Sequence, residues 1–233
     1  MPVFRYDSAI MDKFPNTVGG VIVGEGLINA QIPDELVNLY LAEQDAVKTR
    51  IGNTPLSEIA SLSAWRRVFS AFGVSPTKYR SAPESLLRRL TKKGNIPSIN
   101  TLVDIGNLIS IRYGVPIAVF DRQHANGIVT VHLSDGTERY QELGDKQIIH
   151  PEVGEVVFSD EAKMVIARRW CWRQSRESAA TENTQQVVIV LEAQHEGGHE
   201  TIKNAVDDIL ALLQKFAGGQ YKHDILDSHS LSM

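Results

Sequence analysis

The sequence is poor in cysteine and in long apolar runs, and these absences exclude several classes of protein. Its 233 residues include one cysteine, Cys171, so neither an internal disulfide framework nor a cysteine-based zinc knuckle can form. The longest apolar runs, such as VVIVL at 187–191, are far shorter than the roughly 18 residues that cross a bilayer. The N-terminal stretch MPVFRYDSAIMDKF carries an early acidic residue and no apolar core, unlike a signal peptide. We therefore expect a cytoplasmic protein with no membrane partner.

The chain as a whole also has no large excess of charge of either sign. The 24 Lys and Arg residues oppose 28 Asp and Glu residues, which gives a net charge of −4. Any nucleic-acid binding must therefore come from a local patch. Between Ser61 and Asn100 the one acidic residue, Glu84, faces eight basic residues. Such a cluster is typical of contact with a phosphate backbone, but also of helices with solvated basic faces. The candidate nucleic-acid contacts in this stretch are Lys78, Arg80, Arg88, Arg89, Lys92 and Lys93.

Hydrophobic spacing predicts an α+β fold. Apolar residues at helical spacing predict helices over about 33–50, 55–72, 82–93, 99–113 and 200–216, with Thr54 capping the second of them. A strand is expected at 18–26, and strand-like segments run from residue 116 to residue 193. Asn126-Gly127 and Asp135-Gly136 are typical of two-residue hairpin turns, so we expect consecutive strands here to pair as an antiparallel meander. The result is mixed or antiparallel sheets flanked by helices, and the polar residues 220–233 are expected to be a loose tail.

A second cluster combines aromatic and basic side chains at the end of a predicted strand. It comprises Arg168, Arg169, Trp170, Cys171, Trp172 and Arg173. Strand alternation places Trp170 and Trp172 on one face, and Arg169, Cys171 and Arg173 on the other. Two indoles beside guanidinium groups suit a nucleotide, because bases stack on aromatic rings and guanidinium groups bind phosphate. The alternative is a pair of core tryptophans capped by surface arginines.

The string His195-Glu196-Gly197-Gly198-His199 matches the HExxH pattern of zinc proteases. That chemistry needs both histidines on one helical face, but the two glycines in the middle of the string weaken a helix. We predict a loop between a strand and a helix, with no metal site and no cofactor. Cys171 has no histidine near it in sequence to activate it, which favours a small buried side chain over a nucleophile.

Most of the chain resembles a known family. PSINTLVDIGNLISIRYGVPIAVFD at 97–121 and ESAATENTQQVVIVLEA at 177–193 are similar, in order and spacing, to motifs of the tRNA-binding and editing region of the phenylalanyl-tRNA synthetase β chain, its third and fourth modules. Free-standing proteins built from that region alone look closer still. They share WRRVF at 65–69, PESLLRR at 83–89, GEVV at 154–157 and RRWCWR at 168–173. The resemblance covers about 62–219.

The resemblance implies a fold, an activity and a pocket. It implies an editing-domain-like α+β fold, with a tRNA-binding and editing-like domain at 61–219 and residues 1–60 packed onto it as a strand and a helix in one compact domain. In the family this region hydrolyses tyrosine wrongly esterified to the phenylalanine tRNA. Of the family's pocket residues, Asn107, Pro116 and Glu192 are matched, whereas Gly106, Ala118 and Trp170-Cys171 replace a threonine, a histidine and an Ala-Gly pair. The bulk of Trp170 favours a small amino acid, or none, over tyrosine.

Two of the matched residues leave alternatives open. Glu192 closes the apolar strand VVIVLEA, so it is either a buried carboxylate that binds the substrate or a strand-end residue that faces water. Asn107 falls in the middle of a predicted helix, where asparagine is a mediocre former. It either caps an adjacent loop or presents its amide to a ligand.

The leading hypothesis is a tRNA-binding protein that removes a wrong amino acid from the tRNA acceptor end in trans and is not itself a synthetase. The basic residues of 78–93 would hold the backbone, with Arg169 and Arg173 nearer the terminal nucleotide. Asn107 and Glu192 would orient the ester and a water. An aminoacyl-tRNA synthetase is a further candidate partner. The alternatives are a non-catalytic module that binds tRNA or a small ligand, favoured by the missing threonine and histidine, and a protein-interaction domain.

Overall fold

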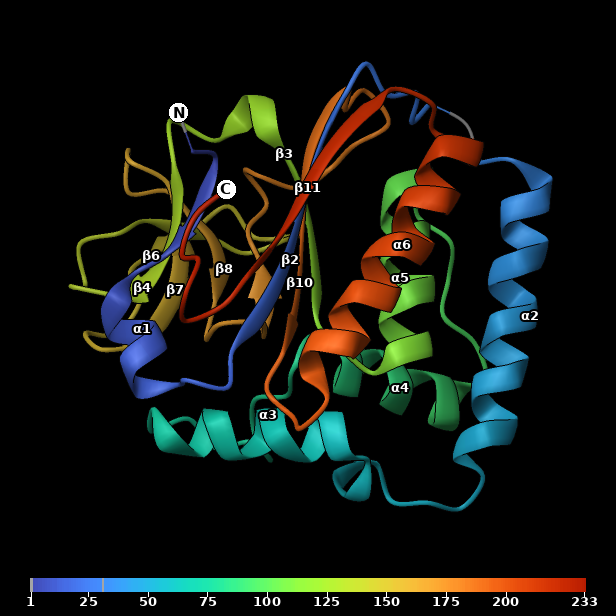
Figure 1. Ribbon diagram of the computed structural model, residues 1–233, viewed down its shortest axis with the longest axis horizontal. Helices are drawn as coiled ribbons and strands as arrows, with labels where there is room; N and C mark the ends of the chain where they lie inside the picture. Colours follow the sequence, from blue (N-terminus) through green and yellow to red (C-terminus); the bar gives the residue numbers. More distant parts are fainter. Residues whose placement is uncertain (1, 31) are drawn as a thin grey trace.

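The computed structural model describes residues 2–30 and 32–233, and its elements form three layers (Figure 1). The strands are β1 Phe4–Tyr6, β2 Val18–Glu25, β3 Ile117–Asp121, β4 Val129–Leu133, β5 Tyr140–Gln141, β6 Ile148–Ile149, β7 Val156–Ser159, β8 Val165–Arg168, β9 Arg173–Gln174, β10 Gln186–Ala193 and β11 Gln220–Leu226. The helices are α1 Ser8–Lys13, α2 Asp34–Ile51, α3 Ala60–Ala71, α4 Ala82–Lys93, α5 Thr101–Tyr113 and α6 Gly198–Phe216, with short 3-10 turns η1 Leu56–Glu58 and η2 Arg122–His124. Helices α5 and α6 cover one face of a central sheet, and a second sheet lies against its other face.

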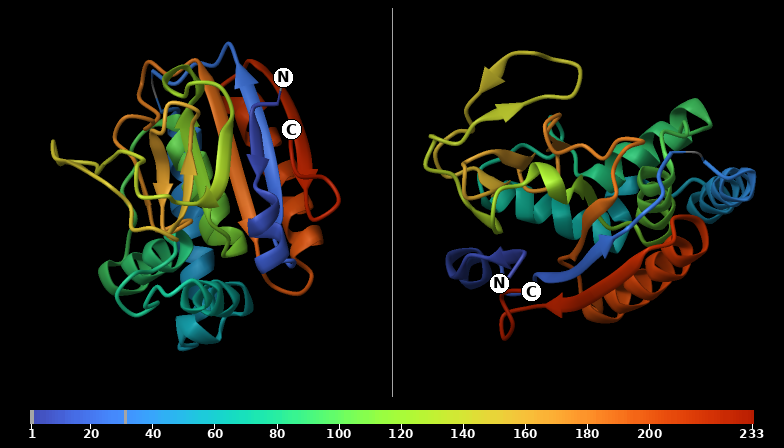
Figure 2. Two further views of the ribbon diagram at one scale, coloured as in Figure 1. Left: turned by 90° about the vertical axis from the view of Figure 1, so that its left-hand side faces the viewer. Right: turned by 90° about the horizontal axis from the view of Figure 1, so that it is seen from above.

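The central sheet has four strands in the order β11-β2-β10-β3, all antiparallel. The second sheet has five strands in the order β1-β4-β7-β8-β9, in which the β1–β4 pair is parallel. Strands β5 and β6 form a small separate pair that projects from the body of the molecule (Figure 2). The predicted α+β class, with mixed and antiparallel sheets flanked by helices, is therefore confirmed.

The predicted meander between 116 and 141 is wrong in its pairing. β3 pairs with β10 in the central sheet, whereas β4 pairs with β1 and β7 in the second sheet. The chain does turn at Gly127 and Gly136, which both have positive φ, but neither turn joins two paired strands. After β3 the 3-10 turn η2 carries the chain from one sheet to the other, so a turn signal alone did not identify the partner strand.

Helix α5 follows the expected capping chemistry at both ends. The Asn100 side chain accepts a hydrogen bond from the Val103 amide at the start of α5, and Gly114 ends α5 in the left-handed region with φ of 68°. Gly94 ends α4 in the same way. The predicted start of a helix at Thr54 is wrong, because η1 comes first and α3 begins only at Ala60.

Strand β10 separates the two cores. Its residues Val187, Ile189 and Leu191 belong to the core under the helices. Val188 and Val190 belong to the core between the two sheets. Because side chains alternate along a strand, the next even position places Glu192 between the sheets.

The expected loose tail is an ordered strand. Residues Gln220–Leu226 form β11, which pairs with β2 along its whole length. Beyond it the Val3 amide donates to the Met233 carbonyl at 2.6 Å, so the C-terminal residues lie beside β1. Polar composition misled the prediction because β11 is an edge strand with mostly exposed side chains. None of the helices in residues 2–30 and 32–233 combines the length and apolar character that a membrane span requires.

Candidate functional site

Glu192 is a buried carboxylate between the two sheets, with 2% of its surface exposed. Its Oε1 accepts hydrogen bonds from the Tyr6 hydroxyl and from Trp170 Nε1, both at 2.8 Å. Among the described residues no donor bonds to Oε2, and Glu192 lines a cavity. The interpretation of Glu192 as a strand-end residue facing water is therefore wrong.

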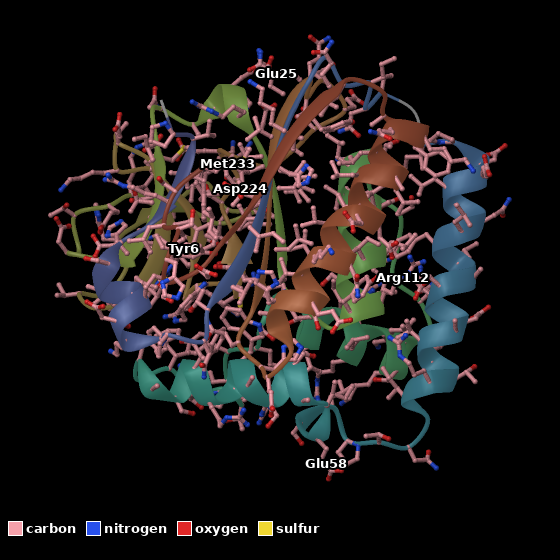
Figure 3. All side chains as sticks on the ribbon, viewed as in Figure 1. Tyr6, Glu25, Glu58, Arg112, Asp224 and Met233 are labelled. Atoms are coloured by element: carbon pink, nitrogen blue, oxygen red, sulfur yellow. The ribbon has the colours of Figure 1, made fainter. Side chains whose placement is uncertain are left out.

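Tyr6 reaches Glu192 because of a glycine. Tyr6 lies on β1 in the second sheet (Figure 3), whereas Glu192 pairs with Gly19 in the central sheet. A Cβ on Gly19 would lie 2.9 Å from carbons of the Tyr6 ring, so a side chain here would displace that ring. Burial first, and then the nearby Glu192 carboxylate, raise the pKa of Tyr6 well above its usual value, which keeps its hydroxyl a donor.

The cavity beside Glu192 has a volume of about 90 Å³. It brings together most of the predicted pocket residues with apolar walls from both sheets. Its lining residues are Ala82, Pro116, Ile117, Ala118, Phe158, Ala167, Trp170, Cys171, Trp172, Arg173, Gln174 and Glu192. The site thus has one carboxylate, mainly apolar walls and one exposed guanidinium group, that of Arg173.

The wall formed by residues 169–172 is a strained turn rather than a strand. Arg169 and Trp170 have positive φ values of 43° and 63°, which side-chain-bearing residues adopt at a cost. The turn is held at several points: the Trp170 amide donates to the Val156 carbonyl at 2.7 Å, and the Ala82 amide donates to the Cys171 carbonyl at 2.8 Å. The predicted strand alternation fails here, because a turn does not place successive side chains on opposite faces.

As a result the two tryptophans have different surroundings. Trp170 is fully buried and packs edge-to-face on Trp65 and Phe14, as the core alternative expects. Trp172 is half-buried and packs on Tyr79, with the Arg169 guanidinium over both rings at 4.7 Å and 3.9 Å from their centres. Trp172 is therefore the more accessible of the two tryptophans.

Two of the arginines predicted to contact phosphate are buried and already bonded within the protein. Arg168 is 6% exposed and forms two hydrogen bonds with Glu155, at 2.8 and 2.7 Å. Arg169 is 8% exposed, and its amide donates to the same carboxylate at 3.0 Å. The RRWCWR stretch predicted a cluster of available cations. Nothing in its local sequence indicated that Glu155 binds the Arg168 guanidinium and the Arg169 amide. Arg173 is half exposed and pairs with Glu142.

Gly106 and Asn107 do not join the Glu192 cavity. They lie on α5, which packs on the helix-covered face of the central sheet, and a Cβ on Gly106 would lie 2.8 Å from Val119 Cγ2. Val119 faces that core, whereas its neighbour Ala118 faces the space between the sheets. The Asn107 side chain lies near Tyr40 of α2. The structure thus separates Asn107 from Glu192, although the resemblance placed them in one pocket.

The basic stretch is divided between a hollow and open surface. A hollow of about 320 Å³ between α3, α4 and η1 is lined by Arg80, Arg88 and Lys92 among other residues. Arg89 and Lys93 do not line it and are exposed, as is Lys78 beside the Tyr79 ring. Sequence reasoning placed Arg66 in the basic stretch but not among the contacts, yet Arg66 also lines this hollow.

Neither the Cys171 thiol nor the HExxH string is arranged for the reaction that its sequence pattern suggested. Burial, followed by the Glu192 charge, raises the pKa of the Cys171 thiol well above its usual value, which disfavours the nucleophilic thiolate. The backbone of Gly197 is left-handed, and α6 begins only at Gly198. His195 and His199 therefore do not lie one turn apart on a helix, which agrees with the predicted loop. Within residues 2–30 and 32–233, no cluster of three potential metal ligands is present.

Burial raises the pKa of Glu192 to about 7, although the hydrogen bonds from Trp170 and Tyr6 lower it in part. An unfolded glutamate titrates near pH 4.3. Between roughly pH 4.5 and 7 the folded state therefore holds a proton that the unfolded state has lost, and the free energy of unfolding falls as pH rises. We expect this group to remove up to about 3 kcal/mol across that window. Denaturant unfolding at several pH values should show the slope in the wild type and its loss in Glu192→Gln; parallel curves would contradict it.

The fold and site define an α+β domain with a carboxylate cavity between two sheets. The sequence model of the B3/4 domain family matches residues 64–218, and the chain belongs to this family. Over 113 residues it is 31% identical to the phenylalanine–tRNA ligase β subunit of Neisseria gonorrhoeae, and over 110 residues it is 27% identical to that of Photorhabdus laumondii. The matches cover 48% and 47% of this chain, but the chain spans only 14% of the length of either relative. The predicted relationship to a synthetase β-chain region is confirmed.

Among solved structures, an N-terminal fragment of the phenylalanyl-tRNA synthetase β-subunit from Pyrococcus horikoshii is similar at a TM-score of 0.47 and 12% identity. The similarity covers 94% of this chain and 50% of that fragment. A likeness of this size carries no argument about the site.

Proposed function

We propose that this protein binds the acceptor end of tRNA and hydrolyses the ester of a wrongly attached amino acid. The buried Glu192 carboxylate carries the proposal: one of its oxygens accepts no hydrogen bond from the described part of the chain, and a cavity lies beside it. The similarity to phenylalanine–tRNA ligase β subunits supports tRNA as the partner, and a synthetase is a further candidate partner. The chain acts as a hydrolase in translation and not as a synthetase.

The chemistry asks little of the protein beyond a held ester and a held water. Water adds to the ester carbonyl carbon, the bond to the terminal ribose oxygen breaks, and a proton passes to that oxygen. A carboxyl group with a pKa of about 7 can accept the proton of the attacking water and return it. Glu192 Oε1 stays fixed by Tyr6 and Trp170, so Oε2 is the atom that takes this role.

The size of the cavity favours a small amino acid. A protein cavity of about 150 Å³ binds benzene, whereas the Glu192 cavity measures about 90 Å³. Trp170 and Phe158 fill the space that an aromatic substrate would need. We therefore expect tRNA esters of small amino acids to be cleaved and tyrosyl esters to be spared.

Binding of uncharged tRNA is expected to weaken with salt. If about four phosphates are contacted, the affinity should fall more than tenfold between about 50 and 200 mM salt. Arg88→Glu with Arg89→Glu should remove most of this binding, measured by fluorescence anisotropy with labelled tRNA. The matched control is Lys203→Glu with Lys222→Glu, which reverses two exposed cations on α6 and β11. Equal affinities for the two double variants would mean that the basic stretch is only a solvated face.

One observation favours a second candidate function, a non-catalytic module that binds tRNA or a small ligand. Gly106 and Ala118 supply no side chain that could hold water or transfer a proton, and Asn107 is remote from the cavity. In that case charged and uncharged tRNA would bind with different affinities, and no ester would be cleaved.

A further inference from the structure

A hollow lined by cations lies close to the Glu192 cavity, between α3 and α4. Its volume is about 320 Å³. Its lining consists of four cations, one carboxylate, three hydroxyl groups and one apolar side chain: Arg66, Arg80, Arg88, Lys92, Glu84, Ser57, Thr77, Thr91 and Leu56. Cations and hydroxyl groups are the donors that proteins present to the phosphates of nucleic acids.

The carboxylate in this hollow arranges its cations without neutralising them. Glu84 is 5% exposed, and its Oε1 accepts a hydrogen bond from Arg66 at 2.7 Å and lies 3.7 Å from Arg80 Nε. One negative charge therefore holds two guanidinium groups in place. Arg88 and Lys92 add two exposed cations that pair with no acidic side chain among the described residues. The hollow keeps a net positive charge and a partly fixed set of donors, which suits a phosphate group.

Helix α4 connects the hollow to the cavity. Ala82, its first residue, lines the Glu192 cavity, and Arg88 and Lys92 of the same helix line the hollow. At about 1.5 Å per residue, Arg88 and Lys92 lie about 9 and 15 Å beyond Ala82 along the helix axis. Successive stacked nucleotides are about 3.4 Å apart. These lengths correspond to about three to five nucleotides.

We infer that this hollow binds the phosphates about three to five nucleotides from the 3′ end of an RNA strand whose terminal residue lies at the Glu192 cavity. The inference rests on the proposed function, because it takes the occupant of the cavity to be the end of a tRNA. It adds a defined register: α4 sets the distance between the terminal ester and the phosphates that hold the strand. Arg66 and Glu84 become positioning residues of a phosphate site.

The chain supplies matched controls outside the basic stretch. Lys203 on α6 and Lys222 on β11 are exposed cations that do not line the hollow. Neither is among the candidate contacts with nucleic acid. A general attraction between the cations of the protein and RNA would therefore affect these two lysines and the cations of the hollow alike.

The test measures binding of a labelled single-stranded RNA of six nucleotides with the sequence of a tRNA 3′ end. Lys92→Gln and Arg88→Gln should each weaken binding and reduce the slope of log K against log salt by about 0.7, while Lys203→Gln and Lys222→Gln should change neither. A second RNA carries uncharged methylphosphonate linkages at the third to fifth positions from the 3′ end. It should bind the wild type weakly, and Lys92→Gln should weaken it no further.

The outcomes separate this inference from the proposed function. If the wild type binds the RNA but Lys92→Gln and Lys203→Gln behave alike, the phosphate site is wrong and the proposed function stands. The same holds if the uncharged linkages have no effect. If the wild type binds neither this RNA nor tRNA, the proposed function fails, and this inference fails with it.

Discussion

Hydrolysis of a mischarged tRNA by Glu192→Gln is expected to be ten- to a hundredfold slower than by the wild type, with uncharged tRNA bound almost equally well. A contact made by a charged, desolvated carboxylate is worth about 1.5 to 3 kcal/mol, which corresponds to that range in rate. Glutamine keeps an oxygen to accept from Tyr6 and Trp170, so the wall of the cavity stays in place. The measurement is single-turnover deacylation, with anisotropy for binding on the same sample.

The control for this variant is Glu196→Gln, the same change four residues along the chain at an exposed position. It should hydrolyse at the wild-type rate. Folding is checked by thermal unfolding, in which Glu192→Gln should be at least as stable as the wild type above pH 7, because it removes a buried charge. Unchanged hydrolysis by Glu192→Gln, on every ester that the wild type cleaves, would remove Glu192 from the reaction.

Glu155→Ala is expected to lower the free energy of unfolding by about 3 to 5 kcal/mol. Glu155 is 5% exposed and accepts both hydrogen bonds of the Arg168 guanidinium, so its removal leaves that cation buried without its ion-pair partner. It also frees the Arg169 amide at the strained turn. For a chain of this size the melting temperature should fall by about 6 to 20 °C.

Glu152→Ala is the matched control, since Glu152 precedes Glu155 by three residues and is exposed. It should shift stability by no more than about half a kcal/mol. If Glu155→Ala is as stable as this control, Arg168 does not depend on Glu155 and is free for phosphate. That result would restore Arg168 and Arg169 as candidate contacts with a nucleotide.

Local chemistry in the sequence was sufficient to predict the helices α2 to α6 and the α+β class, but not the short helix α1. Glycines end α4 and α5 in the left-handed region, although the Ser81 side chain before α4 makes no capping hydrogen bond. The alternation along β10 is also local, and it determines which side of the sheet Glu192 faces. Each of these features depends only on residues within one element, so it can be predicted from a single sequence.

The arrangement around the cavity depends on partners that are remote in sequence. Tyr6 is 186 residues from Glu192, and Glu155, directly before β7, is 13 residues from Arg168 on β8. The Gly19-Gly20 pair within β2 was a signal that another part of the chain approaches closely, but it does not name the approaching residue. The alternation assumed for Trp170 and Trp172 failed because the backbone turns at Arg169.

Deacylation of a panel of mischarged tRNAs tests the central claim most directly. The purified chain is incubated with tRNAs carrying glycine, alanine, serine, tyrosine or phenylalanine, and release of the amino acid is compared with spontaneous hydrolysis. The account predicts accelerated release of at least one of the three small amino acids and no acceleration for tyrosine, because the cavity beside Glu192 measures about 90 Å³. Release no faster than the spontaneous rate for every ester, by protein that still binds tRNA, would contradict it.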